Sequence, residues 1–166
     1  MILTRKEIKH LILEKGLISN YIDFDTQLQS HGFDVTVSEI YSVGGECAFD
    51  FTKEKQKLSS RKEIDPLHRI EPVVLSPGSY VVRLNEVVKL PNDIMAVVYP
   101  RSSLLRSGVS LHSAVWDAGY HGRGELLLQT SVVTKFYRNA RIGQMIFFRL
   151  FSETEGYNGT YQGESL

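Results

Sequence analysis

The sequence predicts an all-β sandwich or barrel-like domain preceded by one helix. Three observations predict this fold class: a capped helical pattern at the start of the chain, period-two alternation from Phe33 onward, and turn-forming tripeptides between short β-rich segments. A chain of 166 residues with 42% apolar content can bury one core and is too short for two comfortable domains. We therefore expect residues 1–166 to form a single domain.

The leading helix is predicted by its end signals. Thr4 is a natural N-cap, and Glu7 three residues later completes a capping box. Apolar residues within 8–12 then fall on one face, and Gly16 suits a left-handed cap that ends the helix. The sequence therefore predicts a helix between Thr4 and Gly16.

The remainder of the chain is predicted to consist of short strands joined by turns. The expected strands contain residues 33–37, 80–84, 94–99, 125–129 and 145–151. Turn chemistry at residues 76–78, 91–93, 117–119 and 141–143 predicts short antiparallel connections. The strongly charged stretch 52–69 is expected to be a solvated excursion.

Charge and cysteine content exclude several classes of function. Nineteen basic residues against nineteen acidic ones leave no cationic excess for a DNA duplex. The single cysteine, Cys47, excludes an internal disulfide and a thiolate zinc site, and it suits a reducing compartment. No apolar run reaches the length of a signal peptide or a membrane span. We expect a soluble, cytoplasmic protein with no membrane partner.

The densest group of chemical side chains is the segment 100–108, which follows the β-rich run ending at Tyr99. Arg101, Ser102 and Ser103 come first, and Arg106 lies four residues after Ser102. If Ser102 caps a short helical turn, then hydroxyl, backbone N–H and guanidinium groups converge in a way that suits phosphate oxygens. A capped turn with a surface arginine is an equally good interpretation of this composition.

A second candidate group surrounds Asp117. An aspartate between an apolar segment and a tight glycine turn can lie at the edge of water, where its carboxylate can accept a proton. The alternative is a β-turn aspartate that binds its own backbone. Tyr120 is either a core residue or a flat platform for a sugar or base, and Trp116 has the same two interpretations.

Four segments, taken in order, resemble the first four motifs of the trimeric dUTPase and dCTP deaminase superfamily. They are Gly32-Phe33-Asp34-Val35, Pro100-Arg101-Ser102-Ser103-Leu104, Asp117-Ala118-Gly119-Tyr120-His121-Gly122 and Arg141-Ile142-Gly143-Gln144. The resemblance implies a dUTPase-like distorted jelly roll, or β-clip barrel, that assembles as a homotrimer. It also implies active sites at subunit boundaries that bind a deoxynucleoside triphosphate with Mg²⁺.

The superfamily has a deaminase branch and a hydrolase branch, and one position separates them. The deaminases place a glutamate in a Leu-Glu pair ten residues after the aspartate, where this chain has Leu127. The nearest carboxylate is Glu125, and a two-residue displacement moves a side chain by about 6–7 Å along a strand. The resemblance therefore favours hydrolysis of dUTP to dUMP and pyrophosphate, with dCTP deaminase or a bifunctional enzyme as the alternative.

The resemblance assigns roles to the phosphate end of the site. Asp117 would be the general base, and the Ser102 hydroxyl would face the bridge between the α- and β-phosphates. Asp34 would support the metal only indirectly, or would tie strands together as a buried carboxylate. The residues expected around the phosphates are Arg101, Ser102, Ser103, Arg106 and Gln144.

The resemblance also assigns the sugar end. Tyr120 matches the aromatic residue beneath the deoxyribose, and Trp116 would narrow the base pocket. Tyr157 and Tyr161 lie in a C-terminal arm, 153–166, that is expected to close over the nucleotide; a disordered tail is the alternative. A nucleotide-binding sensor module of the same superfamily is the non-enzymatic alternative.

Overall fold

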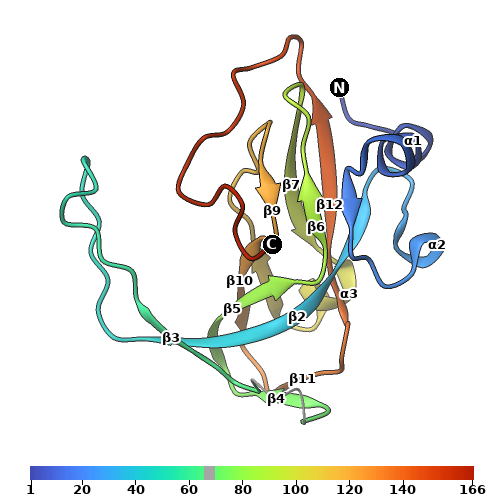
Figure 1. Ribbon diagram of the computed structural model, residues 1–166. Helices are drawn as coiled ribbons and strands as arrows, with labels where there is room; N and C mark the ends of the chain where they lie inside the picture. Colours follow the sequence, from blue (N-terminus) through green and yellow to red (C-terminus); the bar gives the residue numbers. More distant parts are fainter. Residues whose placement is uncertain (66–69) are drawn as a thin grey trace.

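The computed structural model describes residues 1–65 and 70–166, which fold around a β-barrel with two helices at one side (Figure 1). Within this described part there are three helices and twelve strands. They are α1 (Arg5–Lys15), β1 (Ile18–Ser19), α2 (Phe24–Gln27), β2 (Phe33–Gly44), β3 (Ser60–Glu63), β4 (Val73–Leu75), β5 (Gly78–Leu84), β6 (Val87–Lys89), β7 (Ile94–Pro100), α3 (Ser102–Arg106), β8 (Val109–His112), β9 (His121–Gly122), β10 (Glu125–Thr130), β11 (Thr134–Phe136) and β12 (Arg141–Arg149).

The main sheet is antiparallel and nearly closes on itself. Its strand order is β7-β12-β2-β5-β10-β8, with β3 paired to β2, and the terminal strands β7 and β8 contact each other. Two small sheets, β1-β6-β9 and β11-β4, complete the wall. Buried apolar side chains from these strands and from α1 form one core. The predicted β-rich barrel with a leading helix is confirmed.

The helix α1 begins and ends at the predicted signals. A carboxylate oxygen of Glu7 accepts hydrogen bonds from the Thr4 backbone N–H at 2.9 Å and from the Thr4 hydroxyl at 2.8 Å. Gly16 adopts the left-handed conformation, with φ of 65°, at the C-cap. The buried residues of the helix lie within 8–12, as its periodicity predicts. Among the described residues, no helix combines the length and apolarity needed to cross a membrane.

Two expectations about the strands are wrong. Residues 141–143, predicted as a turn, open the strand β12, and a register shift between Arg141 and Gly143 forms a bulge against β2. The connections are also less local than the turns predict, because most hydrogen-bonded neighbours in the main sheet are not consecutive in the chain. Turn chemistry sets where the chain reverses, but side-chain burial selects the partner strand.

A hairpin arm, defined here as residues 45–59, projects from the body between β2 and β3 (Figure 1). It contains Phe49 and Phe51, which are 72% and 103% exposed. The part of the charged stretch within residues 52–65 is largely exposed, as predicted. Residues 66–69 of that stretch lie outside the described residues.

Candidate functional site

The Asp117 turn is fixed by backbone bonds on both sides. Trp116 forms an isolated bridge with Ala96 of β7, and its N–H and C=O groups each make a 2.9 Å hydrogen bond to that residue. The Asp117 carbonyl accepts a 3.1 Å hydrogen bond from the Tyr120 N–H, which closes the turn. Asp117 is exposed, whereas Trp116 and Tyr120 on either side are buried. The carboxylate therefore lies at the edge of water on a rigid support.

Three aromatic rings line up beside this turn. The ring centroids of Trp116 and Tyr120 are 5.3 Å apart, and those of Tyr120 and Tyr157 are 5.8 Å apart, both in edge-to-face geometry. Such pairs favour a fixed ring orientation. Burial raises the pKa of the Tyr120 hydroxyl, with a further contribution from the negative charge of Glu164. Tyr120 therefore stays neutral and presents a rigid ring.

The C-terminal segment, drawn in Figure 1 as the red trace that passes β9, lies against the same turn. Its backbone donates from Tyr157 to the Ala118 carbonyl at 2.7 Å and from Gly163 to the His121 carbonyl at 2.8 Å. The side chain of Gln162 accepts from the His121 N–H at 2.9 Å and donates to the Gly119 carbonyl at 3.0 Å. The segment is therefore hydrogen-bonded at three of its residues to positions 118–121, which directly follow Asp117.

A cavity of about 530 Å³ opens between the Asp117 turn, the base of the hairpin arm and the C-terminal segment. This volume falls within the usual range for small-molecule sites. Five residues predicted as site residues line it: Trp116, Asp117, Tyr120, Tyr157 and Tyr161. The lining thus combines aromatic surface for a flat ring with a carboxylate at the solvent edge.

The wall of this cavity depends on Gly124. A Cβ atom at residue 124 would lie 2.0 Å from the Cη2 atom of Trp116, so the indole packs directly on the backbone. We expect Gly124→Ala to displace the indole and lower the free energy of unfolding by about 1–3 kcal/mol. Thermal unfolding followed by tryptophan fluorescence measures this, since Trp116 is the only tryptophan.

Gly44→Ala is the matched control, because a Cβ atom at residue 44 would meet no atom within 4 Å. It should leave the melting temperature and the fluorescence spectrum unchanged. Equal melting temperatures and fluorescence spectra for the two variants would show that the Trp116 indole does not need the space at residue 124.

Glu125 also lines the cavity, although sequence spacing predicted that it would be displaced from the site. Its Oε1 atom accepts two hydrogen bonds from Arg83, at 3.1 Å from Nε and 2.9 Å from Nη2. Its Oε2 atom is paired with Arg61, which also lines the cavity. Two arginines therefore bind both oxygen atoms of the Glu125 carboxylate.

Two of the predicted phosphate residues, Arg101 and Gln144, lie with Asp34 and Arg141 in a second group at the junction of β2, β7 and β12. The Oδ2 atom of Asp34 lies 3.4 Å from the Arg101 Nε atom and 3.2 Å from the Arg141 Nη1 atom. Gln144 is directly opposite Asp34 in the pairing of β12 with β2. Burial raises the pKa of Asp34, and the two arginines oppose that shift. We call these four residues the arginine cluster.

The short helix α3 begins directly after Arg101, a member of the arginine cluster. Its N-cap is Arg101 rather than Ser102, which is the first helical residue, so the predicted serine cap is wrong. Ser102, Ser103 and Arg106 are exposed. Their hydroxyl and guanidinium groups therefore face solvent beside the arginine cluster.

The cavity residues around Asp117 and the arginine cluster remain separate within one chain. Of the described residues that line the 530 Å³ cavity, none belongs to the arginine cluster or to α3. Asp117 and the aromatic rings therefore share one site, whereas the cationic groups expected to bind phosphate lie outside it.

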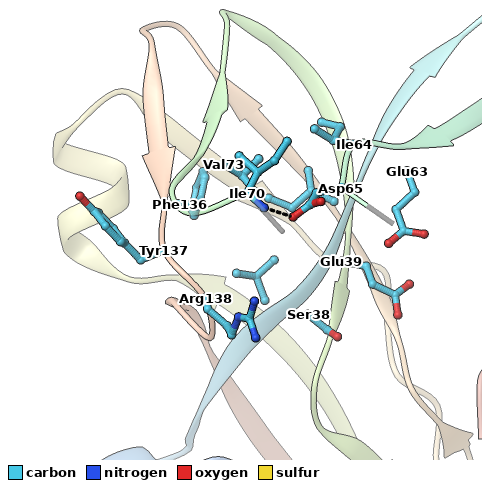
Figure 2. A pocket seen from close by; sticks show the side chains of 12 residues that line it. Ser38, Glu39, Glu63, Ile64, Asp65, Ile70, Val73, Phe136, Tyr137 and Arg138 are labelled. Carbon is cyan, nitrogen blue, oxygen red and sulfur yellow. Dashed lines mark hydrogen bonds between the residues drawn. The ribbon is translucent and has the colours of Figure 1, made fainter. Parts of the chain in front are cut away.

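A second hollow, between β2, the end of β3 and the segment after β11, is shown in Figure 2. Its volume is only about 50 Å³, and its lining includes Glu39, Glu63, Asp65 and Arg138. The Asp65 carboxylate accepts a 2.8 Å hydrogen bond from the Ile70 N–H. This hollow is too small for a nucleotide, so the larger cavity is the candidate site.

The sequence did not indicate three further cavity residues. Arg61 lies in the charged stretch that was interpreted as solvated, and Glu164 lies in the C-terminal segment with no motif around it. Val43, at the end of β2, adds apolar wall. Their positions depend on the β2–β3 pairing and on the path of the C-terminal segment, which no local pattern reveals.

Comparison with known proteins identifies relatives over nearly the full chain. Residues 2–150 match the model of the dCTP deaminase-like family. A protein of Archaeoglobus fulgidus named probable deoxyuridine 5′-triphosphate nucleotidohydrolase is 44% identical over 99% of this chain and 98% of its own length. The Methanocaldococcus jannaschii protein named deoxyuridine 5′-triphosphate nucleotidohydrolase is 37% identical over 92% of this chain and 99% of its own length.

A solved structure has the same fold. The crystal structure of 2′-deoxycytidine 5′-triphosphate deaminase from Agrobacterium tumefaciens superposes with a TM-score of 0.66 at 21% sequence identity. The superposition covers 88% of this chain and 47% of that chain, so this protein spans about half the length of the deaminase chain. The likeness confirms the barrel architecture.

Proposed function

The chain belongs to the dCTP deaminase-like family, and on this basis we propose that it hydrolyses dUTP to dUMP and pyrophosphate. The observation that supports this choice is a difference between two of the cavity carboxylates, Asp117 and Glu125. Asp117 is exposed at the solvent edge, whereas Glu125 is bound by two arginines. The archaeal relatives named as dUTP nucleotidohydrolases support the same choice.

In the proposed reaction, Asp117 orients a water molecule and accepts its proton during in-line attack on the α-phosphorus. The backbone bonds at Trp116 and Tyr120 support this role, because a general base must be held in a fixed position. The Ser102 hydroxyl stabilises the leaving oxygen at the α,β-bridge. Arg101, Arg106 and Gln144, with Ser103 beside them, bind the remaining phosphate oxygens.

The aromatic row supports the proposed specificity for deoxyribose. The buried ring of Tyr120 lies beneath the sugar and leaves no room for a 2′-hydroxyl group. Trp116 bounds the base pocket, and Tyr157 and Tyr161 come from the C-terminal segment 153–166, which closes over the nucleotide. The hydrogen bonds between that segment and the Asp117 loop support this closing role.

We propose a homotrimer in which each site is built from more than one copy. The separation of the cavity from the arginine cluster supports this, because one chain alone does not bring Asp117 and the phosphate residues together. A neighbouring copy would present its α3 and arginine cluster at the mouth of the cavity. Each site would then have a base and a set of phosphate ligands from different subunits.

Mg²⁺ fits this site as an ion chelated by the triphosphate. Mg²⁺ commonly keeps several water ligands and binds through substrate phosphates with few carboxylates. Asp34 would support the ion only indirectly, because its Oδ2 atom already faces Arg101 and Arg141. The ion supplies neutralisation of the phosphate charge, while the residues named above bind and orient the substrate.

We also assign the reaction to the cytoplasm. Cys47 is the only cysteine and is exposed, which suits a reducing compartment. The expected substrate is a free nucleotide, and the balanced charge of the chain suits a small ligand rather than a DNA duplex.

Deamination of dCTP is the second candidate, and the position of Glu125 in the cavity favours it. A deaminating residue must both accept and donate a proton at the pyrimidine ring. Both oxygen atoms of the Glu125 carboxylate are already bound, Oε1 by Arg83 and Oε2 by Arg61, so neither is free to exchange a proton with a pyrimidine ring. Hydrolysis therefore remains the better supported function.

Incubation with dUTP and with dCTP, side by side in the presence of Mg²⁺, tests the proposal. We expect pyrophosphate and dUMP from dUTP, and no ammonia from dCTP. Ammonia release at a comparable rate would establish the deaminase or bifunctional enzyme instead. Binding of dUTP without pyrophosphate release would identify a nucleotide sensor.

A further inference from the structure

The strand β2 is irregular on both edges beside the arginine cluster. Its pairing with β12 shifts register between Arg141 and Gly143, and its pairing with β5 shifts register between Val37 and Glu39. A bulge interrupts the ladder and leaves backbone groups that need other partners. Residues 34–37 therefore depend on groups from outside the sheet.

Side chains from two other segments supply those partners. The Gln27 Nε2 atom donates to the Asp34 carbonyl at 2.8 Å and to the Glu86 Oε1 atom at 2.7 Å. The Glu86 carboxylate accepts from the Thr36 N–H at 2.9 Å and from the Thr36 hydroxyl at 2.6 Å. Asn85 donates to the Val37 carbonyl at 3.1 Å. The backbone of β2 is thus held at Asp34 and at Thr36.

Gln27 is itself held at its other end. Its Oε1 atom accepts from the Ile22 N–H at 2.7 Å and from the Asp23 N–H at 2.9 Å. Gln27 and Glu86 are 1% and 0% exposed, and burial raises the pKa of Glu86. A buried carboxyl group is costly to accommodate, so its complete set of hydrogen bonds indicates a specific role for this geometry.

The role we infer follows from the residue that this network holds. Asp34 orients Arg101, whose Nε atom lies 3.4 Å from the Asp34 carboxylate, and Arg101 is the N-cap of α3. We propose that Glu86 and Gln27 are positioning residues that fix Asp34 and, through it, direct Arg101 toward the triphosphate. This inference rests on the proposed function, since it assigns Arg101 to substrate phosphates.

The isosteric change Glu86→Gln tests the network. An amide has one acceptor oxygen, so its NH₂ group must face either the Gln27 Nε2 or the Thr36 N–H donor, and one hydrogen bond is lost. We expect affinity for a non-hydrolysable α,β-imido analogue of dUTP to fall by about 10-fold, because small displacements of a binding group are costly. Affinity for dUMP, which lacks the β- and γ-phosphates, should change less than about 2-fold. Titration calorimetry on the full-length protein measures both affinities.

A double-mutant cycle with Asp34→Asn separates positioning from general stability. If Glu86 acts through Asp34, then Glu86→Gln adds little to the loss already caused by Asp34→Asn. Glu7→Ala is the stability control, because it removes the acceptor of the α1 capping box without contact to Asp34. This control should lower the melting temperature and leave both affinities unchanged.

Additive losses in the cycle, or equal losses for the two ligands, would overturn the inference while leaving dUTP hydrolysis intact. Failure of the wild type to bind the triphosphate analogue would instead overturn the proposed function together with this inference. If Glu86→Gln does not fold, Thr36→Val provides a second test, because it removes one hydrogen-bond donor to Glu86. It should lower the affinity for the triphosphate analogue more than the affinity for dUMP, by a smaller factor than Glu86→Gln. Thr36→Ser, which keeps the hydroxyl, should restore wild-type binding.

Discussion

Replacing Asp117 by Asn is expected to lower kcat for dUTP by about 10³-fold, because an amide cannot accept the proton of the attacking water. KM should change by less than about 3-fold, since the proposed binding groups are retained. Asp117 is exposed and lies outside the core, so the variant should fold normally. Steady-state pyrophosphate release gives both constants.

Asp25→Asn is a suitable control for this experiment. Asp25 carries an exposed carboxylate in the first turn of α2. It is not one of the described residues that line the 530 Å³ cavity. The kcat and KM of Asp25→Asn should equal those of the wild type. Turnover by Asp117→Asn at the wild-type rate would exclude Asp117 as the base and would redirect the search to the other cavity carboxylates.

The second large effect is expected from mixing two inactive subunits. Asp117→Asn removes the proposed base, and Arg106→Ala removes a proposed phosphate ligand on α3. If one site draws Asp117 from one copy and Arg106 from its neighbour, co-expression of the two variants rebuilds intact sites. With random assembly in equal amounts, about a quarter of the sites should be intact, giving about a quarter of wild-type activity.

A second mixture controls for this recovery. Asp117→Asn combined with the double variant Asp117→Asn/Arg106→Ala contains no base in any subunit, so it should remain inactive. Analytical ultracentrifugation of each mixture checks that assembly is equal. Absence of recovery in the first mixture would mean that each chain uses its own Arg106, and the proposal of shared sites would then be wrong.

The sequence predicted those parts of the fold that depend on neighbouring residues. Thr4, Glu7 and Gly16 lie within one helix and its caps, and the predicted helix is confirmed. The alternation in residues 33–37 and 80–84 likewise predicted strands in β2 and β5, because side chains of period two bury one face of a sheet. Local chemistry was sufficient for both.

The remaining features depend on contacts between distant residues. Residues 141–143 have turn composition, yet pairing with β2 and β7 on both sides makes them strand with a bulge. Glu125 reaches the cavity because Arg83, opposite it on β5, and Arg61 hold its carboxylate there. Spacing along the chain could not predict either result, since each is set by a partner strand.

In the candidate site, too, the sequence predicted what depends on neighbouring residues and missed what depends on distant contacts. The sequence identified Asp117 and the aromatic residues around it from a motif, and these residues line one cavity. It did not identify Glu86, which is separated from Gln27 by 59 positions and lies in no recognisable pattern. A buried carboxyl group of this kind becomes visible only when the two segments are seen together.

The attachment of the C-terminal segment also bears on how this protein can diverge. Several of its bonds to residues 118–123 join main-chain atoms, including those of Tyr157 to Ala118 and of Arg123 to Glu164. Such bonds tolerate most side-chain replacements. Gly156 is an exception, because it has a φ of 80° and a Cβ atom there would lie 2.8 Å from the Asn92 Oδ1 atom. Homologous tails can therefore differ in composition at most other positions and still follow one path, provided that Gly156 and Gly163, which also has a positive φ of 77°, are retained.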